Sequence, residues 1–132
     1  MEKAVHKNQV YYYGIIILMS ILLVWNFNLL MNGSNLVIIH LTFTIITLIL
    51  FLTKNKHSKT AIKIWSAFFF ILAGSLLVLG PLLQIIGSWM SGAEIPDKLN
   101  VLIWGIGNLL VGVLIFIGAD RFILIPNKGI ET

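Results

Sequence analysis

Cysteine is absent from this 132-residue sequence. Its absence excludes disulfide bonds, thiolate metal sites and cysteine nucleophiles, and it leaves the redox compartment open. Charged side chains are also scarce, at 11% of all residues, whereas soluble domains carry about 25%. A surface with so little charge excludes an ordinary soluble domain.

The common catalytic and metal-binding motifs are missing as well. The sequence has no HExxH, no glycine-rich phosphate loop, no serine–histidine–acid set and no paired carboxylates within its apolar runs. Glu94 and Asp97 are too few to hold a hard cation, and Asp97 is placed to cap a helix that follows it. We therefore expect a non-enzymatic protein with no metal and no cofactor.

Apolar residues dominate what remains, at 58% of the chain with a mean hydropathy of +0.98. Crossing a hydrocarbon core of about 30 Å takes about 20 mostly apolar residues in a helix. Four windows qualify, at residues 11–31, 36–52, 61–86 and 99–119. The sequence thus predicts an all-α fold, a four-transmembrane-helix bundle forming a single membrane domain over residues 1–132.

The basic residues predict the direction of the chain, because lysine and arginine accumulate in cytoplasmic loops. With both termini cytoplasmic, the outer side holds only Lys98. The other eight basic residues then fall inside: Lys3, Lys7, Lys54, Lys56, Lys59, Lys63, Arg121 and Lys128. They form no basic stripe of the kind that binds nucleic acid. We expect a multi-pass protein of the plasma (inner) membrane, in contact with lipid and not with nucleic acid.

Aromatic side chains agree with this orientation, since amphipathic rings prefer the headgroup level. Tyr12 and Trp65 are expected to anchor the inner interface, and Trp25, Trp89 and Trp104 the outer one. The two signals are independent.

The third window contains a glycine–proline pair. A helix over residues 61–86 would be about 39 Å long at 1.5 Å per residue, longer than the hydrocarbon core. Pro81 lacks an N–H and clashes with the carbonyl of Leu77, so we expect a kink, or hinge, near Gly80–Pro81. Glycines on the third helix (Gly80 and Gly87) and the fourth (Gly105 and Gly112) are expected to allow close packing.

Polar side chains gather in the outer half of the predicted bundle: Asn28, His40, Thr44, Gln84 and Asn108. They are interpreted as interhelical hydrogen-bonding residues, or alternatively as the lining of an outward-facing polar pocket. His40 and Thr44 are four residues apart and share a helix face.

Three functions are consistent with these features. The first is association without catalysis, as a subunit of a membrane complex or as a homo-oligomer, because four short helices leave their polar faces in need of partners. The second is a small transporter or channel, although no deep ionisable residue is present to couple ions. The third is a lipid- or quinone-handling enzyme, although the sequence lacks the acid–base residues that such an enzyme needs.

Overall fold

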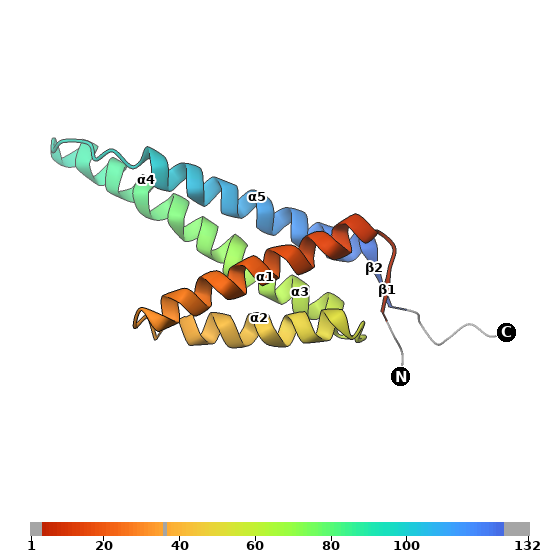
Figure 1. Cartoon of the computed structure of the whole chain (residues 1–132). Helices are drawn as coiled ribbons and strands as arrows, with labels where there is room; N and C mark the ends of the chain where they lie inside the picture. Colours follow the sequence, from red (N-terminus) through yellow and green to blue (C-terminus); the bar gives the residue numbers. More distant parts are fainter. Residues whose placement is uncertain (1–3, 36, 126–132) are drawn as a thin grey trace. The chain divides into compact units, whose positions relative to one another are not determined.

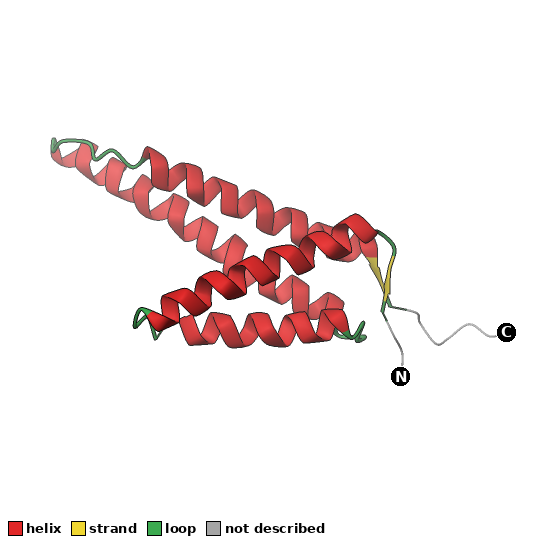
Figure 2. Ribbon diagram, in the orientation of Figure 1, coloured by secondary structure: helices red, strands yellow, loops and turns green. Residues whose placement is uncertain are grey.

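The computed structural model describes residues 4–35 and 37–125. Within them, all regular structure is helical apart from one pair of two-residue strands (Figures 1 and 2). The elements are β1 (Val5–His6), α1 (Gln9–Met31), α2 (Val37–Leu52), α3 (Ser58–Ser66), the π-helix η1 (Ala67–Leu72), α4 (Ala73–Ser91), α5 (Leu99–Phe122) and β2 (Ile123–Leu124). Lys3, Lys128 and the first residue of the predicted second helix, Leu36, lie outside the described residues.

Three helices are long and apolar enough to cross a membrane, which confirms the all-helical membrane class. They are Gln9–Met31, the continuous run Ser58–Ser91, and Leu99–Phe122. The run Ser58–Ser91 has 34 residues and begins and ends outside the predicted 61–86. Helix α2 has only 16 residues, all of them uncharged.

The chain divides into two compact units, which are described separately. The first, called the terminal unit, comprises the described parts of Met1–Trp65 and Ile115–Thr132, and the second, called the hairpin unit, is Ser66–Leu114. In the terminal unit α1 and α2 lie side by side, joined by a tight turn (Figure 1). The Asn8 side chain begins α1 by accepting from the backbone N–H groups of Val10 and Tyr11, which leaves fewer of its free donors unsatisfied.

The core of the terminal unit contains both large apolar side chains and hydroxyls. Met19, Phe51, Ile62 and Trp65 are fully buried. Thr44 and Thr47 are buried on the same face of α2 as Phe51, as their spacing predicts.

The two ends of the described chain are tied together in the terminal unit. Strand β1 pairs antiparallel with β2, with Val5 opposite Leu124 and His6 opposite Ile123. The N–H of Lys7 donates to the carbonyl of Phe122 (2.9 Å), and that of Ala4 donates to the carbonyl of Lys54 (2.6 Å). This strand clasp, comprising β1, β2 and these two bonds, also fixes the α2–α3 loop.

The hairpin unit is held by close helix packing at glycines. A Cβ placed on Gly74 of α4 would lie 2.8 Å from the backbone nitrogen of Leu109 on α5. One on Gly112 would lie 2.6 Å from the Cβ of Phe70, and Gly105 is similarly crowded by Val78. The predicted contacts at Gly105 and Gly112 are confirmed. Those at Gly80 and Gly87 are wrong, because both face open space, and Gly74 takes their place.

Helix α4 continues through Pro81 from Ala73 to Ser91. The described departure from α-helical geometry lies upstream, where η1 adopts the wider π-helical turn. This segment begins at the boundary between the two units. The kink near Gly80–Pro81 stays a prediction. At the end of α4, Gly92 adopts the left-handed conformation that ends many helices.

Candidate functional site

The five predicted polar residues fall in both units. Asn28, His40 and Thr44 belong to the terminal unit, and Gln84 and Asn108 to the hairpin unit. Asn28 and Gln84 are exposed, His40 and Asn108 are half-buried, and Thr44 is fully buried.

Thr44 is used inside the protein rather than at a pocket wall. Its hydroxyl accepts a hydrogen bond from the indole Nε1 of Trp65 at 3.0 Å, and both side chains are fully buried. This placement corrects the expectation that Trp65 lies among lipid headgroups, because the Thr44 hydroxyl satisfies the indole N–H in the core. Trp25, Trp89 and Trp104 are exposed, as interface anchors require.

Asn28 lies on a mostly apolar groove of about 480 Å³ along α1, which it lines with Ser20, Ile21, Val24 and Trp25. Its side-chain oxygen is 3.5 Å from the Asn32 amide that donates to it. The nearby Asn26 is buried and donates to the carbonyl of Leu22, one turn earlier on α1. Of these two amides in α1, only Asn28 faces outward.

A group of polar contacts surrounds the strand clasp. The carboxylate of Asp120, near the end of α5, pairs with Lys59 at 3.1 Å and with Lys63 at 2.7 Å, both on α3. The ammonium of Lys63 also lies 4.3 Å from the centre of the Phe116 ring. Because lysines four residues apart share a helix face, α3 presents both of them to one carboxylate.

Tyr11 joins the first turn of α1 to the last turns of α5. Its hydroxyl donates to the carbonyl of Ile115 at 2.8 Å, and its ring lies against Gly118, where a Cβ would collide with it. The absence of a side chain at Gly118 therefore allows the ring to reach the α5 backbone.

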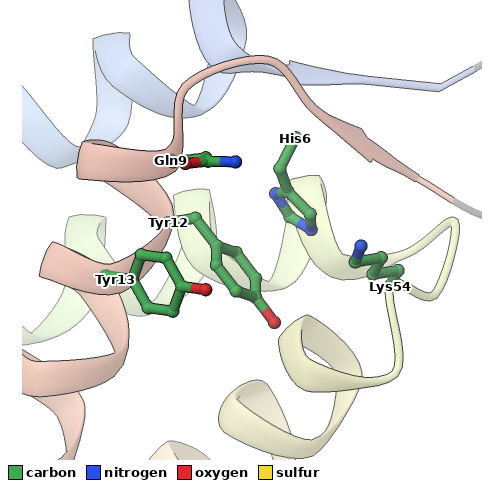
Figure 3. Close-up of a pocket in the computed structure, with 5 residues that line it drawn as sticks. All are labelled: His6, Gln9, Tyr12, Tyr13 and Lys54. Carbon is green, nitrogen blue, oxygen red and sulfur yellow. The ribbon is translucent and has the colours of Figure 1, made fainter.

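Beside the clasp lies a cavity of about 160 Å³, here called the basic cavity, which is lined by His6, Gln9, Tyr12, Tyr13 and Lys54. Figure 3 shows the His6 ring between the Tyr12 ring and the Lys54 side chain, with the Gln9 amide directed toward it. The His6 ring centre is 4.7 Å from that of Tyr12 and 4.6 Å from that of Phe51, which it meets edge-on.

His6 is the lining residue of this cavity whose hydrogen-bonding groups most clearly lack partners among the described residues. Both ring nitrogens are shielded, and neither has a hydrogen-bond partner among the described residues. Partial burial, and then the positive charge of Lys54, lower the pKa of His6 below its usual value of 6.5. Both effects disfavour the charged imidazolium, so the ring is neutral near pH 7.

Among the residues that the structure describes, the lining of the basic cavity offers hydrogen-bond donors and one cation, Lys54, but no acid. In residues 4–35 and 37–125, no three histidine, aspartate or glutamate side chains come together as metal ligands. The described arrangement is suited to binding a polar or anionic group.

The sequence predicts Tyr12 as an interface anchor and Lys54 as an inner-side cation, but it predicts no site formed by His6, Gln9, Tyr12, Tyr13 and Lys54. One signal was available, because the tyrosine run and the basic loop both fall on the predicted inner side. The contact itself depends on the strand clasp, which two-residue strands do not reveal in a sequence.

Comparison with known proteins gives no relative for this chain: no family model, curated protein or solved structure matches it.

Proposed function

We propose that this chain is a multi-pass plasma-membrane protein that acts by association, without catalysis, as a subunit of a membrane complex or as a homo-oligomer. The observation that carries the proposal is the exposure of two amides, Asn28 on α1 and Gln84 on α4, within helices long and apolar enough to cross a membrane. The Asn28 oxygen accepts one long hydrogen bond from the Asn32 amide, at 3.5 Å, but an amide that faces hydrocarbon with its remaining donors and acceptors unmatched is costly. A second protein surface would supply the missing partners.

The extent of exposed helix surface supports the same proposal. Only 17%, 17% and 22% of the apolar windows in the three long helices are buried within the chain. Lipid can cover the aliphatic part of the remainder, but helix association in membranes uses small and polar side chains. Ser20 and Asn28 supply one small and one polar side chain in the otherwise apolar groove on α1.

Four crossings with both ends on one side are supported by a parity argument. Strands β1 and β2 are hydrogen-bonded, which supports placing Val5 and Leu124 on the same side of the membrane. Same-side ends require an even number of crossings, and three crossings would separate them. The 16 residues of α2 span about 24 Å at 1.5 Å per residue, and local thinning of the bilayer accommodates such a short helix.

The cytoplasmic orientation of that end rests on its charge. Lys7, Lys54, Lys59, Lys63 and Arg121 flank the strand clasp or the elements bonded to it, and such residues accumulate on the cytoplasmic side.

Association is tested by measuring the native mass of the full chain in a mild detergent. We expect a complex larger than the monomer, which Asn28→Leu or Gln84→Leu weakens while the helical circular dichroism is retained. Asn100→Leu, at an exposed amide in the first turn of α5, serves as the control and should leave the mass unchanged. A strict monomer that copurifies with nothing contradicts the proposal.

Topology is tested with single cysteines, because the chain has none of its own. A cysteine replacing His57 should react with an impermeant thiol reagent only from the cytoplasmic side, and one replacing Ala93 only from the outside. Labelling of both from the same side contradicts four crossings.

The transporter alternative has weaker support. Thr44, one of the residues proposed to line the transport pocket, already accepts a hydrogen bond from Trp65. The groove beside Asn28 is lined mainly by apolar side chains. A loss of solute flux across the membrane would favour this alternative if it occurred in His40→Leu or Gln84→Leu variants that keep an intact fold.

A further inference from the structure

The basic cavity contains a histidine whose hydrogen-bonding capacity is not used by the described chain. A neutral imidazole has one donor nitrogen and one acceptor nitrogen. In His6 both are shielded from solvent, and the described residues supply a partner for neither. The rings of Tyr12 and Phe51 pack on the imidazole without satisfying it. Leaving such groups unsatisfied costs free energy. A small rotation of the imidazole would open one nitrogen to a ligand in the adjoining cavity, and that hydrogen bond would recover the cost.

The charge of the cavity lining indicates the sign of the ligand's charge. Lys54 is the single charged side chain among the described residues that line the cavity, and none of these residues carries a carboxylate. Asp120, the described carboxylate in the same unit, is engaged by Lys59 and Lys63. The described lining therefore carries a net positive charge, which favours an anion.

The backbone holds Lys54 in place at the cavity. Its φ of +52° lies in the left-handed region, and its carbonyl accepts from the N–H of Ala4 in the strand clasp. The ammonium lies 6.0 Å from the centre of the Tyr12 ring. A cation positioned in this way loses less conformational freedom on binding than one on a free loop.

The hydrogen-bond donors and the size of the cavity narrow the class of anion that it can bind. The Lys54 ammonium, the Gln9 amide, the two phenol hydroxyls and the imidazole N–H can all donate. A volume of about 160 Å³ corresponds to roughly five waters at about 30 Å³ each. This is room for a compact tetrahedral oxyanion with several acceptor oxygens.

We propose that the basic cavity binds a phosphate group through His6, Lys54 and Tyr12, with Gln9 and Tyr13 completing its wall. The group can be free phosphate or the phosphate of a phospholipid headgroup. The second source has the right location, since the cavity lies at the first turn of an apolar helix long enough to cross a membrane, where tyrosines meet headgroups and basic pockets bind anionic lipids.

The experiment uses the full chain labelled with ¹⁵N-histidine in a phosphate-free maltoside detergent. Inorganic phosphate is titrated against chloride at equal ionic strength, and the imidazole signal of His6, assigned by its loss in His6→Phe, is followed. A second arm titrates phosphatidylglycerol into the chain in the same maltoside micelles, with lipid-free micelles as the reference, because phosphatidylcholine would itself supply a headgroup phosphate. We expect a saturable shift of the His6 signal in at least one arm. A shift in the first arm identifies free phosphate as sufficient, and a shift in the second alone identifies a lipid headgroup.

The variants separate a built site from general attraction to a basic protein. Lys54→Asn removes the charge while tolerating the left-handed backbone, and Lys56→Asn makes the same change two residues away, outside the cavity lining. Loss of one charge-assisted hydrogen bond should weaken binding by about tenfold in Lys54→Asn and leave Lys56→Asn near wild type.

Equal weakening in both lysine variants, or no saturable shift in either arm, overturns the proposal. The wild-type titration alone decides it if a variant fails to fold. This site does not depend on association, so a monomer that binds phosphate would contradict only the proposed function.

Discussion

The terminal unit and the hairpin unit are held together by different interactions. The terminal unit combines a strand pair, ion pairs of Asp120 with two lysines, and a buried bond between Trp65 and Thr44. The hairpin unit instead brings η1 and α4 against α5 at Gly74, Gly105 and Gly112, where no Cβ fits. One unit depends on specific polar partners and the other on the absence of side chains.

The two kinds of contact have different physical causes. Within hydrocarbon, lipid tails are as apolar as leucine, so helices gain from close backbone packing rather than from burying apolar surface. Near the membrane surface, charged and hydroxyl groups can be hydrated or paired. Both of the terminal unit's described ion pairs join Asp120 to lysines of α3, Lys59 and Lys63.

Gly74→Ala should have the largest effect, because the new Cβ would meet backbone atoms of α5 at 2.8 and 2.9 Å. Backbone atoms cannot move aside as a flexible side chain can, and overpacking costs about 1–3 kcal/mol. The measurement is unfolding of the purified protein in mixed micelles with increasing dodecyl sulfate. Gly107→Ala is the control, since its Cβ meets nothing within 4 Å, and it should be neutral or slightly stabilising. Equal loss in both variants would contradict glycine-mediated packing.

Thr44→Val should destabilise the terminal unit less, by about 1 kcal/mol, because it removes one buried acceptor while preserving shape. Combining it with Trp65→Phe in a double-mutant cycle measures the coupling between the two side chains. Thr47→Val, on the same buried face, is the matched control and should show no coupling to Trp65→Phe. A coupling as large for Thr47 as for Thr44 would disprove a specific bond.

His6 should make the terminal unit sensitive to acid. Its pKa is lowered in the folded protein by burial and by Lys54, so the unfolded chain binds a proton more readily. The stabilising contribution is complete above the unfolded value of about 6.5 and is lost as the pH falls through the lower folded value. The melting temperature should decrease on acidification, less steeply in His6→Phe and to an intermediate degree in Lys54→Asn. The comparison requires phosphate-free buffer, and identical profiles for all three proteins would refute it.

Asp120→Asn should have the smallest effect on stability. The carboxylate is exposed, and solvent screens its attraction to Lys59 and Lys63. We expect a small decrease in melting temperature at low salt that disappears at high salt, as screening of exposed charges requires. Glu94→Gln makes the same change in charge on an exposed loop and should show no salt-dependent difference from wild type. A large decrease that persists at high salt would show that Asp120 has a structural role beyond these ion pairs.

Regular, local features of the fold were predictable, and contacts between distant residues were not. The hydropathy of residues 11–31 and 99–119 predicted α1 and α5 closely, because a membrane-length apolar helix needs no partner to be recognised. Asp97 was correctly expected to cap α5, and its side chain accepts from the N–H of Leu99. Gly80 and Gly87 were misassigned because spacing shows which residues share a face, but not which face meets a neighbour.

The sequence by itself determined that this protein is helical, has membrane-length apolar spans and carries its basic residues beside them, since hydropathy and charge are properties of single residues and short windows. Only the tertiary structure decided that Trp65 bonds Thr44, that Gly74 rather than Gly80 meets α5, and that His6 and Lys54 share a cavity. Those outcomes depend on pairings across tens of residues, and two-residue strands such as β1 and β2 leave no periodic pattern from which to infer them.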